Sequence, residues 1–361
     1  MPLTPKKYLN DQRTQELINE IRQRNPATFV GTTAEWNALT AAQKAKYVLV
    51  NLTDDIVDTD KINDISGSLR NPNLLDNPWF TVNQIEFTGP NESRGITVDR
   101  WYSDKGTTFS NGIITQEKVA GAGGSTNLYQ NAELSLVESL FGKTVTLSVM
   151  LADGTVKSIT GTCRTRDQLV DNWNNFLQSN RSLDLGNNIY AQLYAKYDLA
   201  NNVLTGAQFP IIRVSGAPDG TTISIKAVKL ELGSISTLAN DIEPNYAEEL
   251  AKCQRYCMVF DPKMYHIIGH GMLLGAKLLY FSMPTPVSMR DVTSVSIPSF
   301  MINYKDGVNL NVETSEVKYI RTTKNGVTLH LIPTADITYT ENAYVEVVTN
   351  NVDKVILATD F

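Results

Sequence analysis

The sequence predicts a mainly β protein, with helices confined to the N-terminal region and to two later connections. From about residue 71 onward, apolar and polar residues alternate, which is the period of strands that bury one face. Dipeptides that favour tight hairpin turns interrupt these runs at Asp153-Gly154, Asp306-Gly307 and Asn325-Gly326. Asparagine and threonine are plentiful, as expected of short strands joined by many turns. A chain of 361 residues is long enough for two or three domains, each with its own core.

The first predicted element is a helix over residues 8–24, capped by Asn10 or Asp11. Its apolar stripe is narrow and consists of Leu17, Ile18 and Ile21. A stripe this thin cannot hold a lone helix in water, so we expect these three residues to dock on sister subunits or on a larger particle.

Two capping boxes follow, and each predicts a short helix. Thr32-Thr33-Ala34-Glu35 precedes Trp36, and Thr40-Ala41-Ala42-Gln43 opens the second helix. A strand is expected over residues 48–52. We interpret Trp36 as a core residue of this small module, which with the first helix forms residues 1–53.

Residues 54–70 are polar and rich in aspartate, with Ile62, Ile65 and Leu69 at a spacing of three and then four. This spacing fits a short coiled-coil seam, and isoleucine-rich seams favour three strands. A solvated linker explains the same residues equally well, and Gly67 weakens the helical interpretation.

The next unit, residues 71–244, is predicted to be a β-sandwich. We expect its opening strand within residues 71–101 and its closing strand at residues 229–233. One helix is expected inside it, because Thr165 and Gln168 form a capping box and the apolar residues that follow share one helical face. That helix should lie across a sheet and bury both Trp173 and Phe176.

A connecting helix capped by Asn245 is predicted over residues 245–257. It should separate the sandwich from a C-terminal β-module over residues 258–361. This module is expected to be a second sandwich, with strands at 277–281, 292–297, 317–321, 327–332, 344–348 and 354–357.

The overall charge and hydropathy exclude several classes of function. A net charge of −6 argues against a nucleic acid partner, because phosphate binding needs a basic surface. No apolar run approaches the ~20 residues of a membrane helix, so we expect no membrane insertion. Residues 1–7 lack the apolar core of a signal peptide, which predicts assembly in a cytoplasm. Nothing in the sequence implies a cofactor.

The cysteines and histidines carry no strong metal signal. Cys253 and Cys257 are four residues apart on the predicted connecting helix, but no further ligands follow at zinc spacing. We interpret them as small buried thiols rather than a metal or redox pair. His266 and His270 have the spacing of a helical metal pair, but the metalloprotease glutamate is missing and Gly269 argues against a helix. We therefore expect no metal site.

No motif marks a catalytic residue either. No Gly-x-Ser-x-Gly elbow occurs, and none of the 38 acidic residues stands in a local motif for glycan cleavage. The prediction is a protein that is not an enzyme and has no catalytic residues.

Four blocks of the sequence occur in a distinctive order: Asn73-Leu74-Leu75-Asp76-Asn77, Val98-Asp99-Arg100-Trp101, Lys229-Leu230-Glu231-Leu232-Gly233 and Cys253-Gln254-Arg255-Tyr256. Together, these blocks resemble tail-fibre and receptor-binding proteins of tailed bacteriophages. A fifth segment, Gly31 to Asp55, resembles an N-terminal module of phage fibres on tails and heads, and residues 281–290 resemble their terminal modules.

This resemblance implies a virion appendage assembled in the host bacterial cytoplasm and located on the tail, baseplate or head. It implies an N-terminal helical anchor with a small α/β module, then a jelly-roll-like sandwich similar to carbohydrate-binding modules. The N-terminal segment would bind other virion proteins, and the chain would form a homotrimer, with a dimer as the alternative. It also implies core positions for Trp79 and Trp101.

Host surface glycan is the expected ligand, because β-sandwiches commonly bind sugars through exposed aromatic rings flanked by amide and carboxylate groups. The candidate aromatic residues are Tyr102, Tyr129, Tyr304 and Tyr319.

Two other functions stay open at this stage. The chain is equally compatible with a head-fibre or baseplate adaptor that holds another virion protein without binding a receptor. A glycan hydrolase is the second alternative.

Overall fold

The structure is a computed structural model that describes eleven segments of the chain. The predicted docking residues Leu17, Ile18 and Ile21 lie outside them, as do Ile62, Ile65 and Leu69 of the predicted seam. The described residues are 28–31, 33–44, 49–52, 71–120, 125–260, 267–274, 278–297, 299–304, 308–334, 343–348 and 354–359.

The N-terminal module combines two short helices with a two-stranded parallel sheet. Strand β1 (Thr28–Gly31) pairs with β2 (Leu49–Leu52), and α2 (Thr33–Ala38) and α3 (Ala41–Lys44) connect them. The second capping box is confirmed, because the Thr40 amide donates to Gln43 Oε1 at 2.9 Å and the Gln43 amide donates to Thr40 Oγ1 at 3.3 Å.

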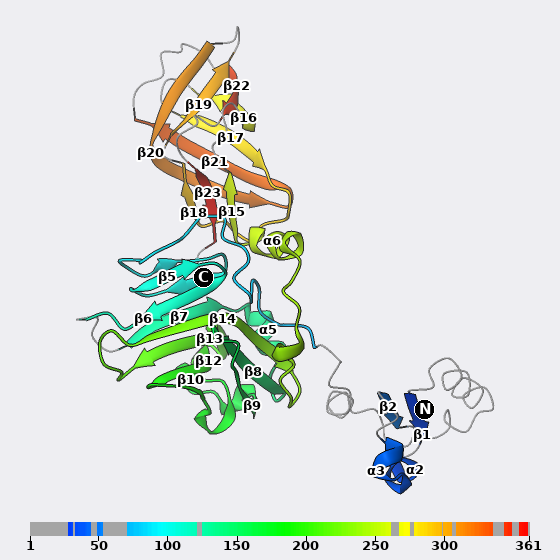
Figure 1. The fold of residues 1–361 in the computed structure, drawn as a ribbon. Coiled ribbons are helices and arrows are strands. Elements are labelled where there is room, and N and C mark those ends of the chain that lie inside the picture. The colour runs from blue at the N-terminus through cyan, green and yellow to red at the C-terminus, as the bar shows by residue number, and fades with distance from the viewer. Residues whose placement is uncertain are drawn as a thin grey trace, which may run out of the picture.

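The central body is a β-sandwich of two antiparallel sheets, coloured cyan to green in Figure 1. The smaller sheet has the order β5 (Thr107–Ser110), β6 (Ile113–Glu117), β14 (Thr222–Leu232), β8 (Thr144–Leu151) and β9 (Val156–Thr162). The larger sheet has the order β10 (Asn172–Asn175), β12 (Ile189–Asp198), β13 (Val203–Ser215), β7 (Ser125–Asn131), β4 (Trp101–Ser103) and β3 (Gly95–Ile96), with β11 (Leu183–Gly186) also paired to β12.

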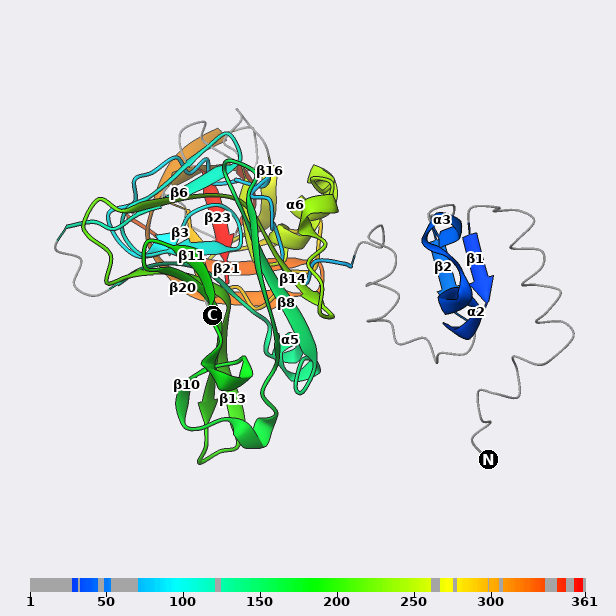
Figure 2. The same ribbon diagram turned by 60° about the horizontal axis from the view of Figure 1, so that its bottom comes forward.

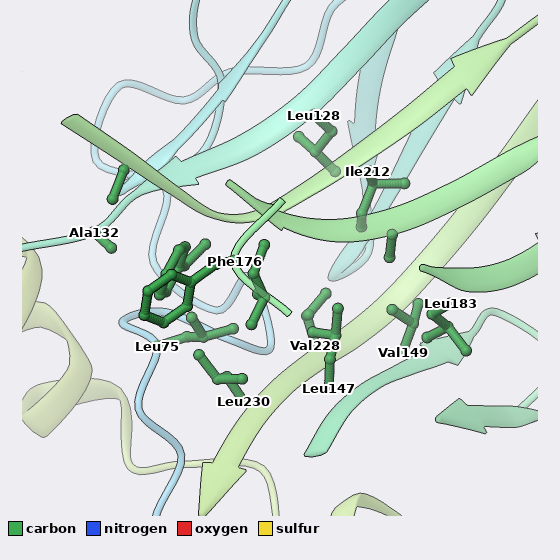
Figure 3. Packing of buried hydrophobic residues seen from close by; sticks show 14 of the residues in the cluster. Leu75, Leu128, Ala132, Leu147, Val149, Phe176, Leu183, Ile212, Val228 and Leu230 are labelled. Carbon is green, nitrogen blue, oxygen red and sulfur yellow. The ribbon is translucent and has the colours of Figure 1, made fainter. Parts of the chain in front are cut away.

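Apolar side chains from both sheets meet in one core. Leu128 and Ile212 of the larger sheet face Leu147, Val149 and Val228 of the smaller one, as Figure 3 shows. The predicted hairpin at Asp153-Gly154 is confirmed, since it joins β8 to β9. Alternation along the strands of the larger sheet thus buries one face and leaves the other free for a site, whereas β8 and β14 of the smaller sheet are buried on both faces.

The predicted opening strand is wrong for most of its length, because residues 71–94 contain no strand. Instead, a side chain of this segment forms hydrogen bonds with the backbone of β14. Asn73 Nδ2 donates to the Val228 carbonyl at 2.8 Å, and Asn73 Oδ1 accepts from the Leu230 amide at 3.1 Å. Asparagine side chains bond readily to nearby backbone and favour irregular structure over a regular ladder.

The predicted helix over residues 165–177 is also wrong. Its capping box exists, but it opens only a single 3-10 turn, Arg166–Gln168, and the chain then enters β10. Asn172 has a φ of 77°, and the Asn174 side chain bonds both the amide and the carbonyl of Val170. These local bonds compete with helical ones. Phe176 is buried as expected, whereas Trp173 is 42% exposed.

Helix α6 (Tyr246–Gln254) connects the sandwich to the C-terminal body. Its predicted cap is confirmed, because Asn245 accepts a hydrogen bond from the Ala247 amide. Cys253 lies in this helix, but Cys257 begins the next strand, so the two thiols do not share a helical face.

The C-terminal body is a closed six-stranded barrel with a small sheet, where a second sandwich was predicted (Figure 1). The small sheet has the order β15 (Cys257–Phe260), β23 (Val355–Ala358) and β18 (Ser294–Ser296), and it lies between the barrel and the sandwich. The barrel order is β16 (Ile267–Leu273), β17 (Leu279–Pro284), β21 (Gly326–Pro333), β20 (Val308–Thr323), β19 (Ser299–Tyr304) and β22 (Ala343–Val348).

Two local features accommodate the curvature of the barrel. Strand β20 is sixteen residues long and pairs with β19 through its first part and with β21 through its second, so it carries the sheet around a corner. Gly271 of β16 permits a close approach to β17, since a Cβ there would lie 2.1 Å from the Tyr280 carbonyl oxygen. The hairpin predicted near Asn325-Gly326 is confirmed between β20 and β21, whereas Asp306-Gly307 lies outside the described residues.

Polar contacts where the sandwich meets α6 and the C-terminal body involve residues of three of the four blocks used for the family resemblance, all but Lys229–Gly233. The Asn77 amide donates to Glu249 Oε2 at 2.7 Å, and Arg100 Nε lies 3.0 Å from Asp76 Oδ2. The guanidinium of Arg100 stacks 3.5 Å from the ring centroid of Tyr256, whose hydroxyl donates to Glu133. We call Asn77, Arg100, Glu133, Glu249 and Tyr256 the joint.

A candidate binding cleft on the larger sheet

The outer face of the larger sheet is polar and aromatic. On β12, Ala191, Leu193 and Ala195 point into the core, so the residues between them face outward. These outward residues are Tyr190, Gln192, Tyr194 and Lys196. Figure 2 shows β10 and β13 at the end of the sheet that projects from the body.

A cleft of about 400 Å3 lies on this face. Residues from six separate parts of the chain contribute to it, including one from the segment that follows β17. Its lining, which defines the cleft below, consists of Arg94, Asn131, Ala132, Leu134, Trp173, Lys196, Thr205, Gly206, Ala207, Gln208 and Arg290.

Trp173 is the exposed aromatic residue of the cleft. It lies on β10 directly opposite Lys196 of β12, and Lys196 is opposite Gly206 of β13. A Cβ at Gly206 would lie 3.7 Å from Cη2 of the Trp173 ring. The edge of the indole therefore reaches over to Gly206, and the ring, which is 42% exposed, places a flat apolar surface beside a cationic group.

Arg94 is held in place by Tyr129. Its Nε donates to the Tyr129 hydroxyl at 2.5 Å, and its guanidinium lies 5.2 Å from the ring centroid. Burial raises the pKa of Tyr129, although Arg94 acts in the opposite direction. The phenol therefore stays neutral and accepts the hydrogen bond from the arginine.

Arg290 enters the cleft from the C-terminal body and connects it to the joint. Its Nη2 lies 3.2 Å from Glu133 Oε2, and its amide donates to the Arg255 carbonyl at 2.8 Å. Burial alone would raise the pKa of Glu133, but the Tyr256 hydroxyl and the charges of Arg290 and Arg255 outweigh it and lower that pKa.

The cleft has a positive lining with amide groups at its edge. Arg94, Lys196 and Arg290 supply the charge, and Asn131 and Gln208 supply amides. Among the described residues that form the lining, no side chain is acidic. An exposed indole with cations and amides can hold a sugar ring by stacking and fix its polar groups by hydrogen bonds.

The lowered pKa of Glu133 makes the joint sensitive to acid. A carboxylate with a depressed pKa stabilises the fold above its ordinary value of 4.5, and this contribution is lost as the pH falls through the native pKa. We expect Glu133→Gln to lower the thermal midpoint at neutral pH and to match the native chain at strongly acidic pH. A difference between the two midpoints that does not change with pH would contradict this assignment.

The four tyrosines predicted as sugar contacts occupy different settings. Tyr129 is only 2% exposed and stacks against the half-buried Tyr102 at 5.7 Å, so it supports Arg94 and offers no free ring face. Tyr304 ends β19, and its side chain lies outside the described residues. Tyr319 is 48% exposed on the barrel and does not line the cleft.

Tyr319 belongs to a row of side chains that crosses five barrel strands in register. His330 lies opposite both Tyr319 and Tyr280, with ring centroids 5.0 and 4.5 Å away. Met272 lies opposite Tyr280 and also opposite Tyr344, which is 64% exposed. We call Tyr344, Met272, Tyr280, His330 and Tyr319 the aromatic row.

Trp173, Lys196 and Arg290 were missed as site residues by sequence reasoning. Alternation along residues 189–198 could have placed Lys196 on an outer face. Trp173 was assigned to a buried helical stripe, and nothing local connects Arg290 to the sandwich.

The cysteines are buried and unpaired, as the interpretation of Cys253 and Cys257 as buried thiols requires. Burial raises the pKa of Cys163 and of Cys257 to about 12, and burial with nearby carboxylates raises that of Cys253. We expect iodoacetamide to leave the native protein unmodified at mildly alkaline pH and to label all three cysteines in denaturant. Rapid labelling of the native protein would contradict this expectation.

Neither metal clusters nor bilayer-spanning helices occur in the part of the chain that the structure describes. No three histidine, cysteine, aspartate or glutamate side chains there are grouped to hold an ion; His270 lies on β16, and His266 is outside these residues. No helix there has the length and apolar character needed to cross a bilayer.

Comparison of the chain with protein-family models, with curated proteins and with solved structures found no match.

Proposed function

We propose that this protein is a structural appendage protein of a tailed-phage virion, and that its sandwich binds host surface glycan in the cleft around Trp173. The observation that carries the binding proposal is the exposed indole of Trp173, which lies opposite Lys196 and extends towards Gly206. The appendage assignment rests on the resemblance of the four sequence blocks, three of which contribute residues to the joint.

In this proposal, different segments of the chain have different roles. The N-terminal segment attaches to the particle through a helical anchor, and the jelly-roll-like sandwich and the barrel project from it. Several copies, three in a trimer, then combine weak contacts through their high effective concentration on one surface.

Trp173→Ala tests the binding site. With an array of bacterial surface polysaccharides as the probe, we expect at least tenfold weaker binding, because truncating a central aromatic contact commonly costs more than about 1 kcal/mol. Val170→Ala is the matched control, since Val170 is exposed nearby but outside the lining. Equal binding by Trp173→Ala and the native chain, with unchanged thermal midpoints, would exclude the cleft.

An adaptor that holds another virion protein is the second candidate, and the aromatic row favours it. Exposed tyrosine and methionine side chains that cross neighbouring strands form the kind of patch used in protein contacts. Loss of virion incorporation in Tyr319→Ala together with Tyr344→Ala, with polysaccharide binding absent in the native chain, would favour this function.

A further inference from the structure

We infer that the ligand of the cleft is an acidic glycan, whose carboxylate or phosphate group lies against Lys196 while a sugar ring stacks on Trp173. This inference rests on the proposed function and adds the chemical class of the ligand.

The first argument is local charge. Arg94, Lys196 and Arg290 bring three positive charges to the cleft, and Glu133 beside Arg290 compensates one of them, which leaves a balance of two. The whole chain carries −6. A positive cleft in an acidic protein focuses the field at one place and attracts anions there while the rest of the surface repels them.

The second argument is that the fold does not neutralise these charges itself. Among the described residues, no carboxylate lies within ion-pair distance of Lys196, and Arg94 bonds the neutral hydroxyl of Tyr129. Like charges that share a concave surface repel one another, so a bound anion would relieve an existing repulsion. A purely structural role explains Arg290, which pairs with Glu133, but not Lys196.

The third argument is register. Trp173 and Lys196 are directly opposite each other on neighbouring strands, so their Cβ atoms are about 5 Å apart. That separation is comparable to the width of one sugar ring. A sugar ring that stacks on the exposed part of the indole therefore brings an exocyclic acidic group within reach of the Lys196 ammonium. Gln208, on the strand beyond, offers an amide to the hydroxyl groups.

The test compares acidic polysaccharides with neutral versions of the same chains. Bacterial surface polysaccharides are arrayed in native, carboxyl-reduced and dephosphorylated forms and probed with the full chain. The variants are Lys196→Gln, Trp173→Ala and a control, Lys226→Gln, which removes the same charge from the outer face of the smaller sheet.

We expect at least tenfold weaker binding when the acidic group is removed from the glycan. Lys196→Gln should weaken binding to the acidic glycans by a similar factor and leave binding to the neutral forms unchanged. Added salt should weaken glycan binding by the native chain more than binding by Lys196→Gln. Lys226→Gln should bind as the native chain does. The carboxyl-reduced and dephosphorylated arms distinguish a uronic acid from a phosphate group.

The outcomes separate this inference from the proposed function. If native and neutralised glycans bind equally and Lys196→Gln has no effect, while Trp173→Ala abolishes binding, the acidic specificity is wrong and glycan binding stands. If Trp173→Ala changes nothing, or no glycan in the array binds, the proposed glycan function fails and the inference fails with it.

Discussion

Replacing Lys229 by methionine is expected to lower the free energy of unfolding of the sandwich by about 3–5 kcal/mol. The Lys229 side chain is fully buried on β14 and lies 2.7 Å from Asp241 Oδ2 and 3.6 Å from Glu231 Oε2. Its Nζ also donates to Thr237 Oγ1 at 2.7 Å. Methionine fills a similar volume but leaves two poorly solvated carboxylates without their cation, and thermal unfolding should shift by on the order of 10 °C.

Lys226 provides the matched control for this substitution. It lies three residues earlier on the same strand and is exposed, so Lys226→Met should change stability by no more than about 0.5 kcal/mol. Adding Asp241→Asn to Lys229→Met should recover part of the loss, because one uncompensated charge disappears. Denaturant unfolding measures all three, and a loss below about 1 kcal/mol for Lys229→Met would contradict the assigned role.

Tyr256→Ala is expected to uncouple the barrel from the sandwich. The ring of Tyr256 receives the Arg100 guanidinium at 3.5 Å, its hydroxyl bonds Glu133, and its backbone carbonyl accepts from the Thr359 amide at 2.9 Å. The residue therefore contacts both bodies at once. Removing a buried aromatic side chain costs about 3–5 kcal/mol, and most of that loss should fall on the joint.

Calorimetry and limited proteolysis check this expectation. In the native chain the sandwich and the barrel should unfold in one calorimetric transition. In Tyr256→Ala they should unfold in separate transitions, and proteolytic cleavage between residues 233 and 257 should be faster. Tyr256→Phe, which keeps the ring and loses only the hydroxyl, should cost about 1 kcal/mol. Identical transitions in the native chain and Tyr256→Ala would mean that other contacts hold the bodies together.

Strand content was predictable from the sequence because burial imposes a period of two. Residues 189–198 alternate without interruption and form β12, and the Asp153-Gly154 turn falls where its dipeptide predicts. The cap at Asn245 was predictable for a similar reason, since one side chain satisfies an amide only two residues away.

The secondary-structure predictions were wrong where a side chain competes with the backbone for hydrogen bonds. Residues 169–177 have helical spacing of apolar groups, yet Asn174 bonds Val170 and the chain becomes a strand. Asn73 likewise replaces a strand ladder by amide contacts to β14. The spacing of apolar residues alone does not show whether such side-chain bonds or the regular backbone hydrogen bonds of a helix or a sheet are stronger.

The cleft could not have been predicted because its parts are distant in the chain. Arg94, Trp173, Lys196 and Arg290 meet only after the larger sheet has formed and the C-terminal body has docked. Closure of the barrel is equally non-local, since it depends on β16 pairing with β22 about seventy residues later.

The ring of six strands in the C-terminal body has a consequence for crowding. In the part of the chain that the structure describes, each strand of the ring has a hydrogen-bonded neighbour on both sides, so the ring has no edge strand. Strand addition by a neighbouring molecule would therefore have to use an edge strand of the open sheets, such as β5 or β9 of the sandwich, rather than a strand of the barrel.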